Sequence, residues 1–277
     1  MRHDVAKPQL SRFHAGVTQG RAYNRGMDTI AKLCQARRVF SAVLLFALIT
    51  AGSAARAQET GAPKVPNTLQ QRIASCTGCH GVHGEGTPES GFFPRLAGKP
   101  AGYLARQLKD FQDGLRKYGP MEYTVRHLSP EYMHEIADYF AAQEVPYARS
   151  PLPRVSPEAL KRGEELATKG DPSREVPACI ACHGTELTGV QPNVPGLVGL
   201  PYDYLSSQLG SWRTKTRATV APDCMAEIAN RLSASDISAV SAWLAGRELP
   251  SDMHAQPAGT ITPPLHCGVL GATGDGA

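Results

Sequence analysis

Hydrophobic residues along the chain form one long run, followed by a series of mixed segments. The run extends from Val39 to about Ile49, follows two arginines, and precedes small residues that end at Ala57. This order of charged, apolar and small residues is typical of a secretory signal with cleavage after Ala57. The run is shorter than the roughly 20 residues that span a bilayer, which disfavours a retained membrane anchor.

Residues 1–57 are therefore interpreted as a signal region, in which Met27 is a more natural start than Met1 because it gives a shorter basic segment. This region holds 9 of the 29 Lys and Arg residues but 2 of the 25 Asp and Glu residues, so the remainder has a net charge of −3. Nucleic-acid binding requires a strongly positive surface. The sequence therefore predicts no nucleic-acid partner.

The mixed segments after residue 57 predict two sets of three helices, from the residue types that begin and end helices. Asn67 with Gln70, and Ser233 with Asp236, have the spacing of capping boxes. In each set the first helix is expected to carry a pair of cysteines at its end. The expected helices span 67 to the first cysteine pair, 100–115 and 129–143, then 156–170, 201–215 and 233–247.

The two sets are copies of one unit. PRLAGKPAGYLARQL (94–108) aligns without a gap with PGLVGLPYDYLSSQL (195–209), and 121–140 aligns with 225–244. Such self-similarity indicates a tandem duplication. A proline-rich segment joins the copies. The predicted boundaries are domain 1 at 58–145, a linker at 146–157, domain 2 at 158–250 and a tail at 251–277.

Four of the six cysteines outside the signal region lie in two C-x-x-C-H motifs. In this motif the two thiols can add to the vinyl groups of one haem, while the imidazole binds its iron. The sequence therefore predicts two covalent haem c groups. The motif residues are Cys76, Cys79 and His80 in the first unit and Cys179, Cys182 and His183 in the second.

Three other interpretations of these motifs fit less well. A zinc ribbon has its two cysteine pairs roughly 15–20 residues apart, far closer than these. A thioredoxin-like redox pair requires a βαβ setting, which neither flank predicts. A disulfide between cysteines three positions apart would be strained.

The sixth iron ligand decides what such a haem does, because methionine closes the site for electron transfer and an open position admits oxygen or peroxide. Met121 and Met225 lie at equivalent places in the two repeats. They are therefore the predicted ligands. Other candidates lack an iron-binding counterpart in the other repeat and are expected in the core or at the surface: Met133, Met253, His127 and His134.

The combination of C-x-x-C-H-G, P-x-L-x-G-x-P-x-x-Y-L-x-x-Q-L, and a methionine before a closing helix resembles a duplicated class I cytochrome c, as in dihaem cytochromes of the c4 type. The resemblance covers about 70–247. It implies an all-α fold of two tandem class I cytochrome c domains, each with one haem c. It also implies that the carbonyls of Pro94 and Pro195 accept hydrogen bonds from His80 and His183, and that Tyr103 and Tyr204 line the haem pockets.

Two cysteines remain after haem attachment, and one of them stands in the stretch APDCMAEIANRL beside a predicted ligand. An oxidising compartment favours their pairing, so the sequence predicts a disulfide between Cys224 and Cys267. Two alternatives stay open at this point. Cys224 could be a free structural thiol, or its thiolate could replace Met225 on the iron.

These features predict a periplasmic electron carrier that passes single electrons between periplasmic or membrane-bound redox proteins. Such a partner could also hold it at the membrane surface. One alternative is a dihaem enzyme that oxidises thiosulfate or reduces peroxide, and a second is the electron-accepting subunit of a periplasmic dehydrogenase. An enzyme would require a labile or thiolate ligand on one haem.

Overall fold

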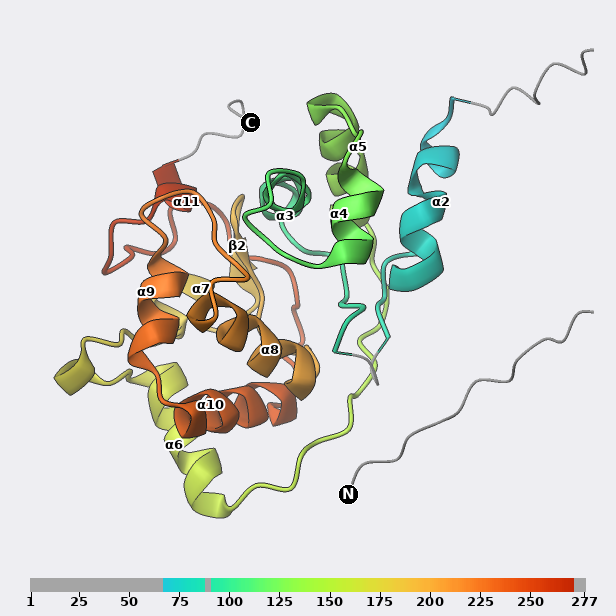
Figure 1. Cartoon of the computed structure of the whole chain (residues 1–277). Helices are drawn as coiled ribbons and strands as arrows, with labels where there is room; N and C mark the ends of the chain where they lie inside the picture. The colour runs from blue at the N-terminus through green and yellow to red at the C-terminus, as the bar shows by residue number, and fades with distance from the viewer. Residues whose placement is uncertain (1–66, 88–90, 272–277) are drawn as a thin grey trace, which may run out of the picture. The chain divides into compact units, whose positions relative to one another are not determined.

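The computed structural model describes residues 67–87 and 91–271 (Figure 1). The predicted signal region lies outside these residues. Within the described ranges, none of the helices combines the length and the apolar character that crossing a bilayer would require.

The described residues of the first repeat form four helices. They are α2 (Leu69–His80), α3 (Ala101–Gln112), α4 (Gly119–Val125) and α5 (Pro130–Ala141). Helices α3 and α5 pack against each other, and α2 lies against α5. Their shared core is built on Ile73, Leu104, Ile136 and Phe140.

The ends of these helices follow local sequence signals, with one exception. The Ser129 hydroxyl accepts a hydrogen bond from the Tyr132 backbone, and Pro130 occupies the first turn of α5. The predicted cap at Asn67 is wrong, because Thr68 caps α2 by accepting from the Gln71 backbone N–H at 3.3 Å. Asn67 instead accepts a hydrogen bond from the Arg72 side chain.

The second repeat contains more elements than the first, and its predicted capping box at Ser233 and Asp236 is present. Its elements are α6 (Pro157–Thr168), the 3₁₀ helix η1 (Pro172–Arg174), α7 (Ile180–His183), β1 (Gly189–Val190), β2 (Val194–Pro195), α8 (Tyr202–Arg213), α9 (Cys224–Arg231), α10 (Ala234–Gly246) and, in the tail, α11 (Gly268–Gly271).

The second cysteine pair does not lie at the end of the first helix of its repeat, contrary to the sequence prediction. Helix α6 ends at Thr168; Cys179 is the N-cap of the separate short helix α7, and Cys182 lies within that helix. The chain turns at Gly170, which has a φ of 75° and no room for a Cβ, because the Val176 carbonyl oxygen would lie 2.3 Å away. Only glycine adopts this conformation readily, and it ends the helix early.

Helices α6 and α10 approach each other closely in the second repeat. A Cβ on Gly163 would lie 2.2 Å from the carbonyl oxygen of Ala239 and 2.8 Å from Cβ of Trp243. Leu166, Val240 and Leu244 extend this contact into the core of the repeat. The absence of a side chain at Gly163 therefore sets the separation of the two helices.

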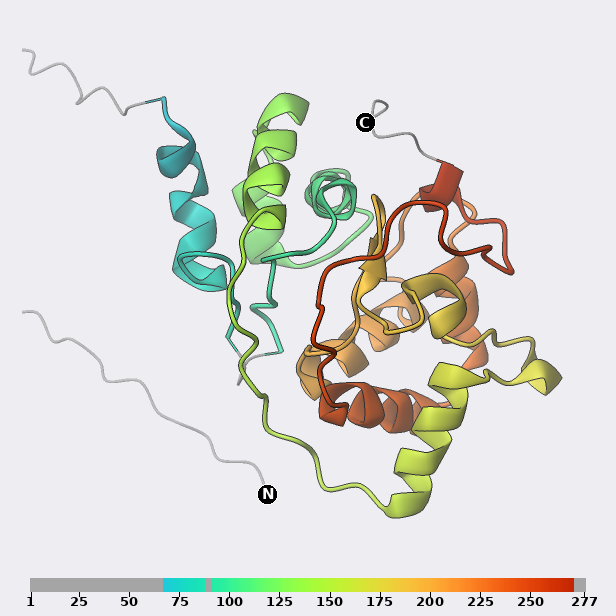
Figure 2. The same ribbon diagram turned by 180° about the vertical axis from the view of Figure 1, so that it is seen from behind.

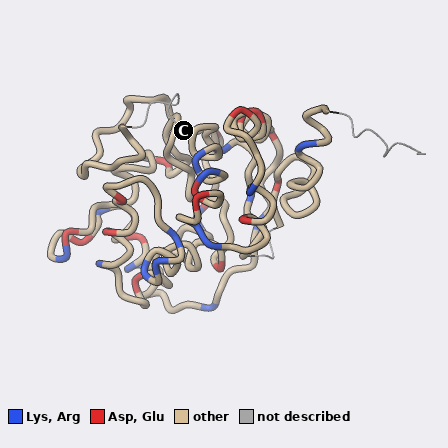
Figure 3. Tube along the Cα trace, turned by 45° about the horizontal axis from the view of Figure 1, so that its top comes forward, with Lys and Arg blue, Asp and Glu red and all other residues tan. Residues whose placement is uncertain are grey.

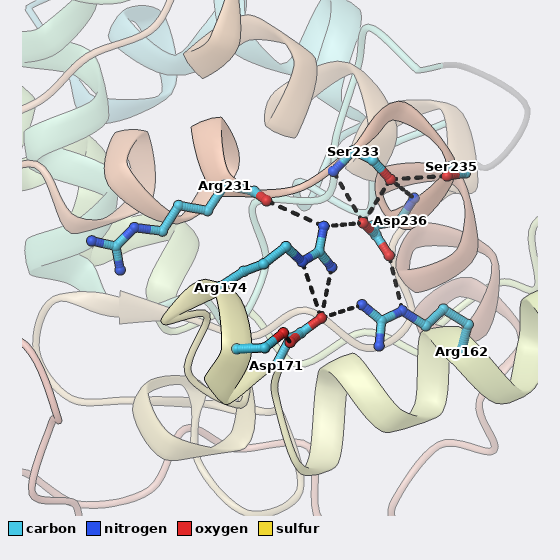
Figure 4. Close-up of polar contacts among 8 residues, drawn as sticks. Arg162, Asp171, Arg174, Arg231, Ser233, Ser235 and Asp236 are labelled. Carbon is cyan, nitrogen blue, oxygen red and sulfur yellow. Dashed lines mark hydrogen bonds and ion pairs between the residues drawn. The ribbon is translucent and has the colours of Figure 1, made fainter.

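A network of four charged side chains fastens α6, η1 and α10 together (Figure 4). Asp236 accepts from Arg162 Nε at 2.9 Å and from Arg174 Nη1 at 2.8 Å. Asp171 accepts from the same two arginines at 2.6 and 2.9 Å. Burial raises the pKa of Asp236, but hydrogen bonds from Arg174, Ser233 and Arg162 outweigh it and hold that pKa well below its usual range.

The tail folds back over the second repeat rather than extending away from it (Figure 2). Gln256 exchanges backbone hydrogen bonds with Gly189 and Gln191 of the β1 region at 2.9 Å. Further on, the Gly268 backbone donates to the Pro222 carbonyl at 3.0 Å, and Cys267 is joined to Cys224 by a disulfide.

The described residues are mainly helical, with strands of two residues each, so the all-α prediction is confirmed. Basic and acidic residues are interspersed along the trace (Figure 3). The basic residues nearest the candidate sites are buried ones, among them Lys99 and Arg217.

Candidate cofactor sites

Each repeat contains a cavity bounded by its C-x-x-C-H motif. The first has a volume of about 230 Å³ and the second about 180 Å³. The first cavity is lined by Cys76, Cys79, His80, Tyr103 and Met121, and the second by Cys179, Cys182, His183, Tyr204 and Met225. Each cavity thus brings together two thiols, an imidazole, a phenol and a thioether.

The two histidines are held in the same way. Nδ1 of His80 lies 2.8 Å from the carbonyl oxygen of Pro94, and Nδ1 of His183 lies 2.8 Å from that of Pro195. Burial lowers the pKa of both imidazoles, which keeps them neutral. A neutral ring that donates from Nδ1 has a lone pair on Nε2 for a metal.

The methionines are placed by two short helices that the sequence did not predict. Met121 lies in the first turn of α4, and Met225 in the first turn of α9. Asp223 caps α9 by accepting from the Ala226 backbone at 3.0 Å. None of the other candidates is among the residues that line the two cavities: Met133, Met253, His127 and His134.

Burial gives Cys76, Cys179 and Cys182 raised pKa values, which do not suit redox catalysis. Burial raises the pKa of Cys179 to about 12 and also raises that of Cys76. Reactive C-x-x-C thiols have lowered pKa values instead. Since the two pairs line different cavities, they also do not converge on one zinc ion.

The two cavities share a wall made of polar residues from both repeats: Lys99, Tyr103, Gln107, Tyr204, Gln208 and Arg217. Across this wall Arg116 donates to Gln107 at 2.9 Å and to Gln208 at 2.7 Å. Arg217 donates to the same two side chains at 2.8 Å each. Apart from Tyr103 and Tyr204, this cluster was not predicted from the sequence, although Gln107 and Gln208 occupy matching places in the aligned repeats.

The donors at this wall fit a cofactor that carries carboxylates. The hydrogen-bond acceptors of Lys99, Arg116 and Arg217 are uncharged carbonyl, amide and phenol oxygens. Within the described ranges, the indole N–H of Trp212, at the second cavity, is buried without an acceptor. Buried cations and donors of this kind require anionic or polar partners, and haem c brings two propionates.

The tail closes part of the second cavity. Cys267, Val269 and Leu270 line it, and the Cys224–Cys267 disulfide, with a Cα–Cα distance of 5.5 Å, stands beside Met225. Cys224 is therefore bonded to sulfur and presents no thiolate to the cavity.

Comparisons with known proteins point to one family. The family model for cytochrome c matches residues 70–145. The chain is 36% identical over 213 residues to the thiosulfate dehydrogenase electron acceptor of Thiomonas intermedia, covering 77% of this chain and 92% of that protein. It is 32% identical over 221 residues to cytochrome c4 of Stutzerimonas stutzeri, covering 74% of this chain and 98% of that protein.

Solved structures agree. Reduced recombinant cytochrome c4 from Pseudomonas stutzeri has a TM-score of 0.54 and 31% identity, over 65% of this chain and 97% of that one. The chain belongs to the dihaem cytochrome c4-like family. Thiosulfate dehydrogenase TsdBA from Marichromatium purpuratum has a TM-score of 0.56 and 34% identity, over 65% of this chain, which spans only 39% of that longer one.

Membership of the cytochrome c4-like family confirms the predicted tandem class I cytochrome c fold. It also gives the chain covalently bound haem c and a role in electron transfer. The geometry of the cavities agrees with this role, since each offers thiols for attachment and a fixed imidazole.

Proposed function

We propose that this cytochrome c4-like chain binds two haem c groups, each ligated by one histidine and one methionine, and passes single electrons between redox partners. Cys76 and Cys79 attach the first haem and Cys179 and Cys182 the second. His80 with Met121, and His183 with Met225, supply the iron ligands. The domain boundaries at 58–145 and 158–250 remain part of this proposal.

One observation carries the proposal. Both cavities hold a C-x-x-C-H motif whose histidine donates to a proline carbonyl, together with a methionine from a short helix. The same arrangement built twice, from segments far apart in the sequence, supports two equivalent sites rather than one active and one structural site.

The chain's own residues then set the conditions for fast electron transfer. Pro94 and Pro195 fix the imidazole rings, which limits rearrangement between oxidation states. Apolar side chains such as Leu104, Phe111 and Leu205 exclude water from the cavities. Haem c supplies the redox chemistry, and methionine ligation raises its potential.

The names of the relatives support a thiosulfate-oxidising dehydrogenase as the electron donor, since two of them are called thiosulfate dehydrogenase electron acceptors. We further propose that the chain works in the periplasm, after removal of residues 1–57. In this second candidate role the protein is the electron-accepting partner of such a dehydrogenase.

An enzyme with its own substrate is less well supported. That alternative depended on Cys224 as a thiolate ligand, and in the structure Cys224 is bonded to Cys267.

Intact mass and spectroscopy of the exported protein test the proposal. We expect a mature chain with two haem groups attached, and a red absorption band of methionine-ligated ferric haem with the intensity of two sites. A chain with one haem, or rapid carbon monoxide binding by the unmutated reduced protein, would contradict it. Mixing with a reduced thiosulfate dehydrogenase, compared with a c-type cytochrome of another pathway, tests the proposed donor.

A further inference from the structure

The tail is fastened to the segment that carries Met225. Cys267 is bonded to Cys224, the residue before Met225. The next tail residue, Gly268, donates from its backbone to the Pro222 carbonyl at 3.0 Å. A movement of this segment away from the second cavity would therefore have to carry the tail with it or break these contacts.

The same few tail residues also reach the segment that orients His183. The Asn193 side chain, which is 8% exposed, donates to the Val269 carbonyl at 3.0 Å. Asn193 lies two residues before Pro195, whose carbonyl oxygen lies 2.8 Å from Nδ1 of His183. The tail thus connects the histidine side of the second cavity with its methionine side.

Between these two attachments the tail covers the cavity. Val269 and Leu270 line it, and Leu270 is 36% exposed, so this side chain separates the cavity from solvent. Cys267, which also lines the cavity, is 7% exposed. One short segment, residues 265–271, therefore provides both the cover and its attachments.

The first cavity differs on this point. In the aligned repeats Pro120, which cannot form a disulfide, takes the place of Cys224. Helix α4, which carries Met121, begins after Tyr118 without a side-chain cap. Among the described residues between α5 and α6, none lines the first cavity. The described part of the chain thus gives Met121 no attachment comparable to that of Met225.

We propose that residues 265–271 form a clamp that holds Met225 in place and closes the second iron to small external ligands. A methionine leaves a haem iron only when the segment that carries it opens locally, and packing and cross-links oppose such opening. A closed iron serves electron transfer alone, whereas an open position admits small molecules. Cys224, Cys267 and Val269 are positioning residues in this proposal, because they act through Met225. The clamp rests on the proposed function, since it requires a haem in the second cavity.

Displacement of methionine by imidazole in the oxidised protein tests the proposal. The measurement uses the Met121→Ala variant, in which the red band of methionine-ligated ferric haem belongs to Met225 alone. Loss of this band after imidazole is added gives the rate at which Met225 leaves. Adding Cys224→Ser and Cys267→Ser together should raise this rate on the order of tenfold, because the cross-link no longer opposes local opening. Replacing both cysteines leaves no thiol that could bind the iron itself.

A second variant loosens the clamp and keeps both cysteines. In Gly268→Ala the new Cβ would meet the Ala221 carbonyl oxygen at 2.4 Å, so the tail has to move away from the Met225 segment. This variant should also speed the loss of the band. Gly163→Ala is the matched control, because its Cβ would meet Ala239 on α10 rather than the tail. It should lower stability and leave the rate unchanged.

The unmutated oxidised protein provides an independent measurement, in which NMR follows the methyl signal of each methionine. Imidazole should replace Met121 before Met225, and this order decides the point even if a variant fails to fold. The proposal is wrong if Met225 leaves first, or if the folded double cysteine variant loses Met225 no faster than its parent. In the latter case the disulfide only stabilises the fold. A protein with one haem, or without the red band, would instead refute the proposed function itself.

Discussion

The four-residue charge network of the second repeat should contribute more to stability than any surface ion pair of the same repeat. The perturbation is Asp236→Asn. The carboxylate of Asp236 has a side-chain exposure of 8%, and it accepts hydrogen bonds from Arg162, Arg174 and Ser233. The amide keeps the shape but loses the charge, and turns an N–H group toward donors.

Breaking a fully buried ion pair typically costs about 3–5 kcal/mol, because the remaining charge is left uncompensated. Here both arginines have a side-chain exposure of 34%, so water can replace part of the lost interaction. We therefore expect Asp236→Asn to lower the free energy of unfolding of the second repeat by about 2 kcal/mol.

Tryptophan fluorescence during denaturation measures this change selectively. The two tryptophans of the chain, Trp212 and Trp243, both lie in the second repeat, so their fluorescence reports that repeat even if the halves unfold separately. Glu227→Gln is the control, since its pair with Arg231 lies on the surface of α9 with the Glu227 side chain 47% exposed. It should cost less than about 0.5 kcal/mol.

The pH dependence gives a second signature. Because the pKa of Asp236 is lower in the folded protein than the roughly 3.9 of an unfolded chain, its stabilisation is complete above that value and disappears as the pH falls toward the folded pKa. Between about pH 5 and pH 3 the unmutated protein should lose stability faster than Asp236→Asn. Equal destabilisation by the two variants at pH 7 would refute the reasoning.

Three further changes have defined outcomes. Met121→Ala should let carbon monoxide bind the first haem of the reduced protein, measured by difference spectroscopy, while intact mass shows the haem still attached. Cys267→Ser should lower the free energy of unfolding of the second repeat by up to about 4 kcal/mol, the entropic value for a separation of 43 residues. Denaturation without reductant measures this loss, and under reducing conditions the same substitution should cost little. Gly163→Ala should cost about 2 kcal/mol, because its Cβ meets the Ala239 backbone at 2.2 Å; an unchanged denaturation midpoint would contradict this close packing.

The sequence predicted the parts of the fold that depend on local signals. Ser129-Pro130 and Ser156-Pro157 begin helices because a hydroxyl cap and a first-turn proline act within four residues. The short helix α9 escaped prediction, since its eight residues carry too few turns for a periodic pattern. The choice of Thr68 over Asn67 as a cap depends on where the Arg72 side chain lies.

The candidate site, like the fold, could be predicted from the sequence only in part. The C-x-x-C-H motifs and the paired methionines could be read from spacing, because a repeat displays each of them twice. The shared wall could not, since Lys99 and Gly196 meet only after both repeats have folded. A lysine in a loop gives no sign in the sequence that it will be buried.

The disulfide of the tail has a consequence for how the protein is assembled. The described residues include six cysteines, which can pair in 15 ways, and the proposed function requires four of them to stay reduced until haem is attached. Cys267 comes after all the haem-binding cysteines in the chain, so Cys224 finds its correct partner last. Until then Cys179 and Cys182 are the thiols available in the same repeat, and a premature bridge to either would block attachment of the second haem. With two haems attached as proposed, haem attachment therefore precedes oxidation of the thiols, and the tail disulfide forms last, on a completed second domain.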